Sequence, residues 1–190
     1  MKQIRIPSFL HDVFGEKQPI GSIIAILLFG GLLTLALGLI YPELTNNLPI
    51  WRSSLALLLI FDILSGCIAN FTPSTSNFYA ARKTNRIVFI AIHVHILVVA
   101  LLLGTDIWYA LAVWGYTIMG AFLVNGLIAK QSQRFVAGLL LSIGLGGIPL
   151  LPGIEPFMLV TYLLFMLKVL FSFAVDHYGS AINGTGGDRA

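Results

Sequence analysis

Charged residues are scarce in this chain of 190 residues: aspartate, glutamate, lysine and arginine make up only 10% of it. Soluble globular domains carry about 25%. Hydrophobic residues account for 57% of the chain, and the mean hydropathy is +0.92. This composition argues against an ordinary soluble domain and predicts a protein of the lipid bilayer. The net charge of +3 is spread over alternate connections, so it does not indicate binding of nucleic acid.

Cysteine is almost absent, because Cys67 is the only one. An intramolecular disulfide and a zinc cluster built on cysteines are therefore excluded. The sequence also lacks a G-x-S-x-G elbow, an H-E-x-x-H zinc motif, a phosphate-binding loop and paired prenyl-type aspartates. No cofactor is predicted. No repeat relates the two halves of the chain, which weakens the hypothesis of an inverted-repeat transporter.

Long apolar runs fill most of the chain. Each is roughly 20 residues long, the length with which a helix crosses about 30 Å of hydrocarbon, whereas barrel strands are about 10 residues long and alternate. The sequence therefore predicts a single all-α domain, a polytopic membrane protein with a bundle of six transmembrane helices joined by short loops. The predicted spans are Ile20 to Tyr41, Ile50 to Asn70, Ile87 to Gly104, Ile107 to Ile128, Phe135 to Leu151 and Pro156 to Val175. The first run is too long for the apolar part of a cleaved signal peptide.

The distribution of charge predicts the orientation of the bundle. Lysine and arginine gather before the first span and in the second and fourth connections, whereas the odd connections carry Glu43, Asp106 and Glu155, with Arg52 as an exception. By the positive-inside rule both termini are cytoplasmic, as expected for a multi-pass protein of a cell membrane. Residues 1–19 are then a cytoplasmic leader, and residues 176–190 form a polar tail.

The leader contains the pattern of a short amphipathic helix. Ser8 is a candidate N-cap, and Phe9, Leu10, Val13 and Phe14 fall on one side of the helix that would follow it. Such a helix would lie flat on the membrane surface. The alternative is a leader without regular structure.

Ionisable residues inside the apolar runs are the strongest functional signal. Asp62 in the second span, His93 in the third and Lys168 in the sixth fall at similar depth in the predicted cytoplasmic half. A charge at a helix centre costs roughly 2.5–3.5 kcal/mol, so we expect Asp62 to be paired with Lys168 or His93. In a regular helix His95 points to nearly the opposite side from His93, and the two cannot face one pocket without a distortion.

These residues predict an acid–base site for a lipid or isoprenoid amphiphile that enters from the cytoplasmic leaflet. The candidate catalytic residues are Asp62, His93, Lys168 and Asp176. The candidate substrate-binding residues are Asn70, Asn77, Tyr79, Arg82, Arg86, Asn125 and Ser172. The connection 71–86 combines hydroxyls with cations and is predicted to hold an anionic lipid headgroup.

Three alternatives stay open at this point. Aspartate and histidine inside a bundle are also typical of a proton-coupled solute transporter. The chain is alternatively an accessory subunit whose polar contacts are structural. The third alternative is a metal site with Asp62, His93 and His177 as ligands, but the i, i+3 or i, i+4 spacing of helix-borne ligands is absent, so no metal is predicted. The two histidines would also be the only pair for a haem, but His177 lies shallower than His93.

Small residues mark the fifth span. Gly138, Ser142 and Gly146 recur every four residues and form a face on which another helix can approach closely. The face predicts packing, including a homo-oligomer formed through it.

Overall fold

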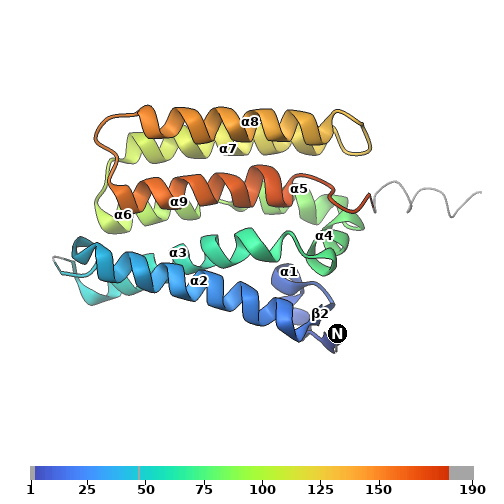
Figure 1. Cartoon of the computed structure of the whole chain (residues 1–190), viewed down its shortest axis with the longest axis horizontal. Coiled ribbons are helices and arrows are strands. Elements are labelled where there is room, and N and C mark those ends of the chain that lie inside the picture. The colour runs from blue at the N-terminus through green and yellow to red at the C-terminus, as the bar shows by residue number, and fades with distance from the viewer. Residues whose placement is uncertain (1–2, 47, 180–190) are drawn as a thin grey trace, which may run out of the picture.

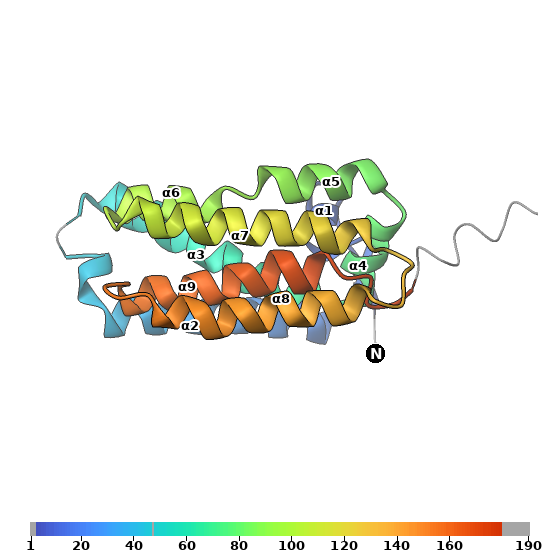
Figure 2. The same ribbon diagram turned by 90° about the horizontal axis from the view of Figure 1, so that it is seen from above.

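The computed structural model describes residues 3–46 and 48–179. Six helices in this part of the chain are long and apolar enough to cross a membrane. They lie side by side in one bundle, and successive helices run in opposite directions (Figures 1 and 2). The predicted all-α bundle is thus confirmed as an arrangement of helices, and its insertion into a membrane stays a prediction.

The spans follow the predicted ranges to within a few residues. They are α2 (Ile20–Ile40), α3 (Ile50–Ala69), α5 (Lys83–Ile92) with α6 (His95–Leu103), α7 (Ile107–Gly126), α8 (Gln133–Gly147) and α9 (Pro156–Met166). Short turns of 3-10 helix, η2 (Pro42–Leu44) and η3 (Ile148–Leu150), follow α2 and α8. A π-helical segment, η4 (Leu167–Phe173), continues α9.

The leader folds into a small hairpin. Strands β1 (Gln3–Arg5) and β2 (Lys17–Pro19) pair in antiparallel fashion, and η1 (Ser8–Leu10) and α1 (His11–Phe14) lie between them. The prediction of Ser8 as an N-cap is wrong, because Pro7 precedes η1 and no side chain caps the turn. The leader is instead fastened to the rest of the protein by side chains that follow the second span.

The second connection is a helix, α4 (Pro73–Ala80), where the sequence predicted only a loop. Thr72 caps it by accepting a hydrogen bond from the N–H of Thr75, and Pro73 occupies the first turn. Threonine and proline are common at the start of helices, but they are also common in turns. The sequence therefore does not distinguish a short helix from a loop at this position. Thr75 donates its hydroxyl to the carbonyl of Val13, and so joins α4 to α1.

Burial rises towards α9 and η4. In the apolar window of this span 61% of the residues are buried, against 17% for α2, which lies at the edge of the bundle (Figure 1). Helix α3 packs against α9 and η4. The central position of α9 and η4 places Lys168 deep among the other helices.

The connections of the bundle gather at two ends. We call "acidic end" the one formed by the connections 41–49, 104–106 and 148–155, and "basic end" the one formed by the leader, α4, the connection 127–132 and residues 174–179 (Figure 1). The sequence predicts that the basic end is cytoplasmic.

The small-residue face of α8 is not used inside the described bundle. A Cβ added at Gly138 or Gly146 would meet no atom within 4 Å, whereas one added at Gly144 would clash with Met166. Close packing of α8 within the chain therefore depends on Gly144. The homo-oligomer predicted through Gly138, Ser142 and Gly146 stays a prediction.

Candidate functional site

A cavity of about 390 Å³ lies in the half of the bundle nearer the basic end. Its wall is built from α1, α3, α4, α5, α6 and η4. Among its lining residues are Asp62, His93, His95 and Lys168, next to the apolar side chains of Val88 and Ile92. We call this space the histidine cavity.

Lys168 and Asp62 form an ion pair in the wall of the cavity. The Nζ atom of Lys168 lies 2.8 Å from Oδ2 of Asp62 and 3.2 Å from its backbone carbonyl oxygen. The lysine side chain is only 4% exposed, whereas the aspartate side chain is 45% exposed. A charge-assisted hydrogen bond therefore holds a buried cation against a carboxylate that still reaches the cavity.

Gly66 makes room for the lysine. A Cβ at position 66 would lie 2.5 Å from Cε and 2.8 Å from Nζ of Lys168, closer than van der Waals contact allows. Gly66 follows Asp62 by one helical turn, so both residues of α3 receive the same lysine side chain. Only a residue without a Cβ leaves Lys168 in this position.

The third span breaks at His93 and Val94, between α5 and α6. His93 has φ −75° and ψ 69°, and the N–H of Val94 donates to the carbonyl of Ile92 across 2.8 Å, as in an inverse γ-turn. No proline or glycine lies at the break. The carbonyl of Phe89, which has lost its regular partner, accepts a hydrogen bond from the ring of His93. The carbonyl of His93 accepts one from the indole of Trp114.

The hydrogen bond to Phe89 fixes the tautomer of His93. A carbonyl oxygen only accepts, so Nδ1 of His93 must carry the hydrogen. In a neutral imidazole the other nitrogen, Nε2, then has a free lone pair. Only 3% of His93 is exposed. The ring is thus oriented as a proton acceptor or ligand.

The break brings His95 to the same cavity as His93. Their ring centroids lie 5.1 Å apart, and Nδ1 of His95 lies 3.7 Å from Oδ2 of Asp62. The expectation that the two histidines face opposite sides holds for a regular helix and fails here because the helix is distorted. His95 lines the cavity but is not among the site residues predicted from the sequence, because no breaker residue signals the distortion.

Other polar residues of the predicted stripes hold the helices together. Ser172 donates its hydroxyl to the carbonyl of Cys67 across 2.7 Å, and Asn70 donates its amide to the carbonyl of Lys168 across 3.5 Å. These bonds tie α3 to η4 at Lys168 and about one turn after it. Neither Ser172 nor Asn70 lines the histidine cavity.

Arg86 is the centre of a second polar cluster. The residue is 2% exposed, and its guanidinium donates to Oδ1 of Asn125 across 2.7 Å and to the carbonyls of Phe173 and Ala174 across 3.0 and 2.7 Å. Gln133 donates to the same carbonyl of Ala174 and accepts from the N–H of Asp176. Arg86, Asn125 and Asp176 thus surround the end of η4 and do not line the histidine cavity.

Arg82 and Tyr79, two residues predicted to bind a headgroup, have partners inside the protein. Arg82 forms an ion pair of 2.9 Å with Glu16 and lies over the ring of Phe78. Tyr79 lines the cavity, and its hydroxyl donates to the carbonyl of Asp12. Burial, with the nearby charge of Asp12, raises the pKa of Tyr79. Asn77 lies in α4 away from the cavity lining, and the headgroup site at 71–86 stays a prediction.

The three candidate metal ligands Asp62, His93 and His177 do not meet at one site, because His177 lies apart from the other two. In the described part of the chain no group of three or more histidine, cysteine or acidic residues could hold a metal ion. His177 lies at the basic end, where its ring contacts Phe71 and its Nε2 lies 3.1 Å from the carbonyl of Phe171. Burial lowers the pKa of His177. It shares no cavity with Asp62 and His93.

The six apolar helices are compatible with an integral membrane protein. No protein-family model, curated protein or solved structure matches this chain.

Proposed function

We propose that this chain is a multi-pass membrane enzyme whose histidine cavity performs acid–base chemistry on a lipid or isoprenoid amphiphile. The observation that carries the proposal is the fixed tautomer of His93, which leaves Nε2 as a proton acceptor in a residue that lines the same cavity as the Asp62–Lys168 pair. Bases are expected where a hydrogen bond to one ring nitrogen orients the other. The function is proposed from this geometry alone.

Each residue of the site has a distinct role in the proposal. Nε2 of His93 removes a proton from the polar group of the substrate. The carboxylate of Asp62, held by Lys168, stabilises positive charge on the nearby imidazole of His95, whose Nδ1 lies 3.7 Å away. Lys168 acts as a positioning residue, because it is buried and its ammonium contacts Asp62.

The lining of the cavity suits an amphiphile. Apolar side chains from α1 and α5, including those of Val13, Val88 and Ile92, alternate with the polar groups of the site. Cavities of about 300–1,000 Å³ accommodate small molecules, so about 390 Å³ admits the polar end of a substrate with part of its chain. With the basic end in the cytoplasm, the substrate would enter from the inner leaflet.

Gly66→Ala tests the proposal by adding a single methyl group next to Lys168. The added Cβ would displace the flexible end of Lys168 from Asp62, while alanine favours the helix. Activity is measured as the ability of the protein to restore the lipid composition of cells from which the gene is deleted. We expect the Gly66→Ala protein to fold but not to restore the lipids. The matched control is Gly38→Ala in α2, where the nearest atom is 4.0 Å away.

Asp62→Asn completes the test, because it keeps the shape and removes the charge. The enzyme proposal predicts that Asp62→Asn does not restore the lipids, and that a companion Lys168→Met change recovers thermal stability in detergent but not the lipids. A purely structural pair predicts instability that Lys168→Met relieves, since a buried charge without its partner costs about 3–5 kcal/mol. Rescue of both stability and phenotype by the double change would refute the acid–base site and favour an accessory subunit.

A proton-coupled solute transporter is the second candidate. It is favoured by the break in the third span and by Oδ2 of Asp62, which lies near both Nζ of Lys168 and Nδ1 of His95. A protonated His95 would compete with Lys168 for the interaction with this oxygen. In addition, broken helices are common at transport sites. Unchanged lipids together with proton-dependent solute accumulation, lost in Asp62→Asn, would select this function over the enzyme.

A further inference from the structure

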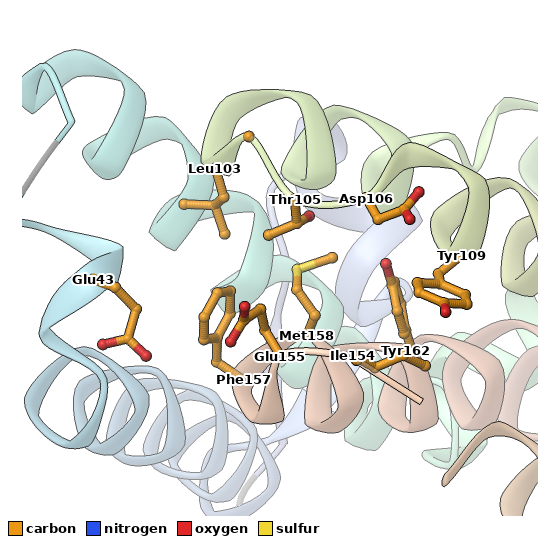
Figure 3. A pocket seen from close by; sticks show the side chains of 12 residues that line it. Glu43, Leu103, Thr105, Asp106, Tyr109, Ile154, Glu155, Phe157, Met158 and Tyr162 are labelled. Carbon is orange, nitrogen blue, oxygen red and sulfur yellow. The ribbon is translucent and has the colours of Figure 1, made fainter. Parts of the chain in front are cut away.

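A second cavity, of about 530 Å³, lies at the acidic end of the bundle, far along the helices from the histidine cavity. Three of its lining residues are acidic, Glu43, Asp106 and Glu155, and none is lysine, arginine or histidine. One acidic residue comes from each connection of this end (Figure 3). The only basic residue nearby in the sequence, Arg52, donates instead to the carbonyl of Leu101 across 2.7 Å.

Tyr162 gives an independent indication of a ligand. The residue is 1% exposed and lines this cavity from the first turns of α9. Its hydroxyl points towards the side of the cavity that carries Asp106 (Figure 3). Within the described residues the hydroxyl forms no hydrogen bond. The phenol oxygen is therefore available to a polar group of a ligand in the cavity.

The walls of the cavity combine carboxylates with aromatic rings. Phe157, which is 4% exposed, and Tyr162 both line the cavity from α9, with Met158 between them (Figure 3). Tyr109 lines it from α7 beside Tyr162, and its hydroxyl donates to the carbonyl of Pro152 (Figure 3). Rings attract organic cations through their faces, and carboxylates attract them through charge. The acidic residues do not form a group that could hold a metal ion in the described part of the chain.

The carboxylates are also not fully used by the fold. Glu155 stands at the N-terminus of α9 without capping it. Asp106 caps α7 through Oδ1, which accepts from the N–H of Trp108 across 2.8 Å. Oδ2 of Asp106 and both carboxylate oxygens of Glu155 therefore remain available to a cation in the cavity.

We propose that this second cavity binds a small organic ammonium ion. The positive charge would lie between the carboxylates of Asp106 and Glu155 and the rings of Phe157 and Tyr162, and the phenol would hydrogen-bond a polar group of the ligand. The proposal is independent of the function assigned to the histidine cavity. The ammonium group belongs either to a free solute or to the headgroup of a lipid such as phosphatidylethanolamine.

Binding of choline to the full-length protein in detergent tests the proposal. We expect a saturable rise of the thermal unfolding midpoint with choline chloride, measured against sodium chloride of equal ionic strength. The neutral isostere 3,3-dimethylbutan-1-ol should give no rise. Asp106→Asn with Glu155→Gln should weaken choline binding by at least about tenfold, a loss of about 1.4 kcal/mol. Asparagine keeps the cap of α7, so the fold should persist.

The matched control is Glu16→Gln, which removes a carboxylate at the opposite end, where Glu16 pairs with Arg82 on the surface. It should bind choline as the unaltered protein does. Tyr162→Phe should weaken binding of choline, which has a hydroxyl, more than binding of tetramethylammonium, which has none. No saturable effect of choline, an equal effect of the neutral isostere, or unchanged binding by the double variant would overturn the proposal.

Reconstitution distinguishes the two sources of the ammonium group. If a lipid headgroup is the ligand, phosphatidylethanolamine bilayers should stabilise the protein over phosphatidylglycerol bilayers, and the double variant should lose this difference. If a free solute is the ligand, choline should stabilise the protein equally in both bilayers. Absence of both effects in bilayers would count against the site.

Discussion

Trp114 donates its indole N–H to the backbone carbonyl of His93 across 3.0 Å, at the residue where the third span loses its helical hydrogen bonds. Irregular backbone at membrane depth persists only where protein or a cavity satisfies its polar groups. Trp114 in α7 therefore supports the break that brings His93 and His95 to one cavity. The position of the histidines depends on a side chain 21 residues away.

Trp114→Phe should destabilise the protein because it leaves the carbonyl of His93 without a donor. An unsatisfied buried polar group costs about 1–3 kcal/mol, and we expect a loss of unfolding free energy in this range. Chemical denaturation in detergent measures it. Trp108→Phe is the control, because Trp108 is 74% exposed and its indole forms no hydrogen bond within the described residues. Equal effects of the two changes would contradict the role of Trp114.

Arg86→Met should be more damaging than a surface change of the same kind. It would leave Oδ1 of Asn125 and the carbonyl of Phe173 without a donor, and the carbonyl of Ala174 with Gln133 alone, so we expect a loss of at least about 2 kcal/mol. The control is Arg82→Met, which removes an exposed ion pair worth about 0–1 kcal/mol. A stable Arg86→Met protein that binds anionic lipid less well would instead support the predicted headgroup site.

His177 should make the folded protein sensitive to acid. Burial lowers its pKa in the folded state below the unfolded value of about 6.5. The unfolded chain then binds the proton more readily, so this contribution to stability is complete above about pH 6.5 and is lost as the pH falls below it. Between pH 7.5 and 5 the thermal midpoint of His177→Gln should fall less than that of the unaltered protein. Parallel curves would show that His177 does not contribute.

Site-directed labelling tests the predicted orientation. In a Cys67→Ala background, cysteine at exposed Thr84 should react with a membrane-impermeant maleimide only from the cytoplasmic side, and cysteine at exposed Thr45 only from the other side. Cys67 is buried, so its removal eliminates a thiol that is already shielded. Reversed labelling would put the basic end outside and would remove the argument for access from the inner leaflet.

Part of the candidate site follows from the sequence. Asp62, His93 and Lys168 stand out because they interrupt apolar runs at matching distances from the predicted membrane surface, and the structure brings them to one cavity. Arg86 and Asp176 stand out for the same reason, yet they lie in a separate cluster around the end of η4. Residue type and depth do not give the rotation of a helix about its axis. That rotation decides which polar residues meet.

The sequence by itself determined the number of spans, their approximate limits and the opposite charge of the two ends. These properties are local: a run of about 20 apolar residues forms a helix in lipid whatever it packs against. Only the tertiary structure decided that the third span breaks at His93, because the break depends on Trp114 of another helix. The same holds for the π-helical η4, whose Lys168 extends along Gly66 to reach Asp62. Contacts between residues far apart in the chain fix both distortions, and they leave no pattern in the local sequence.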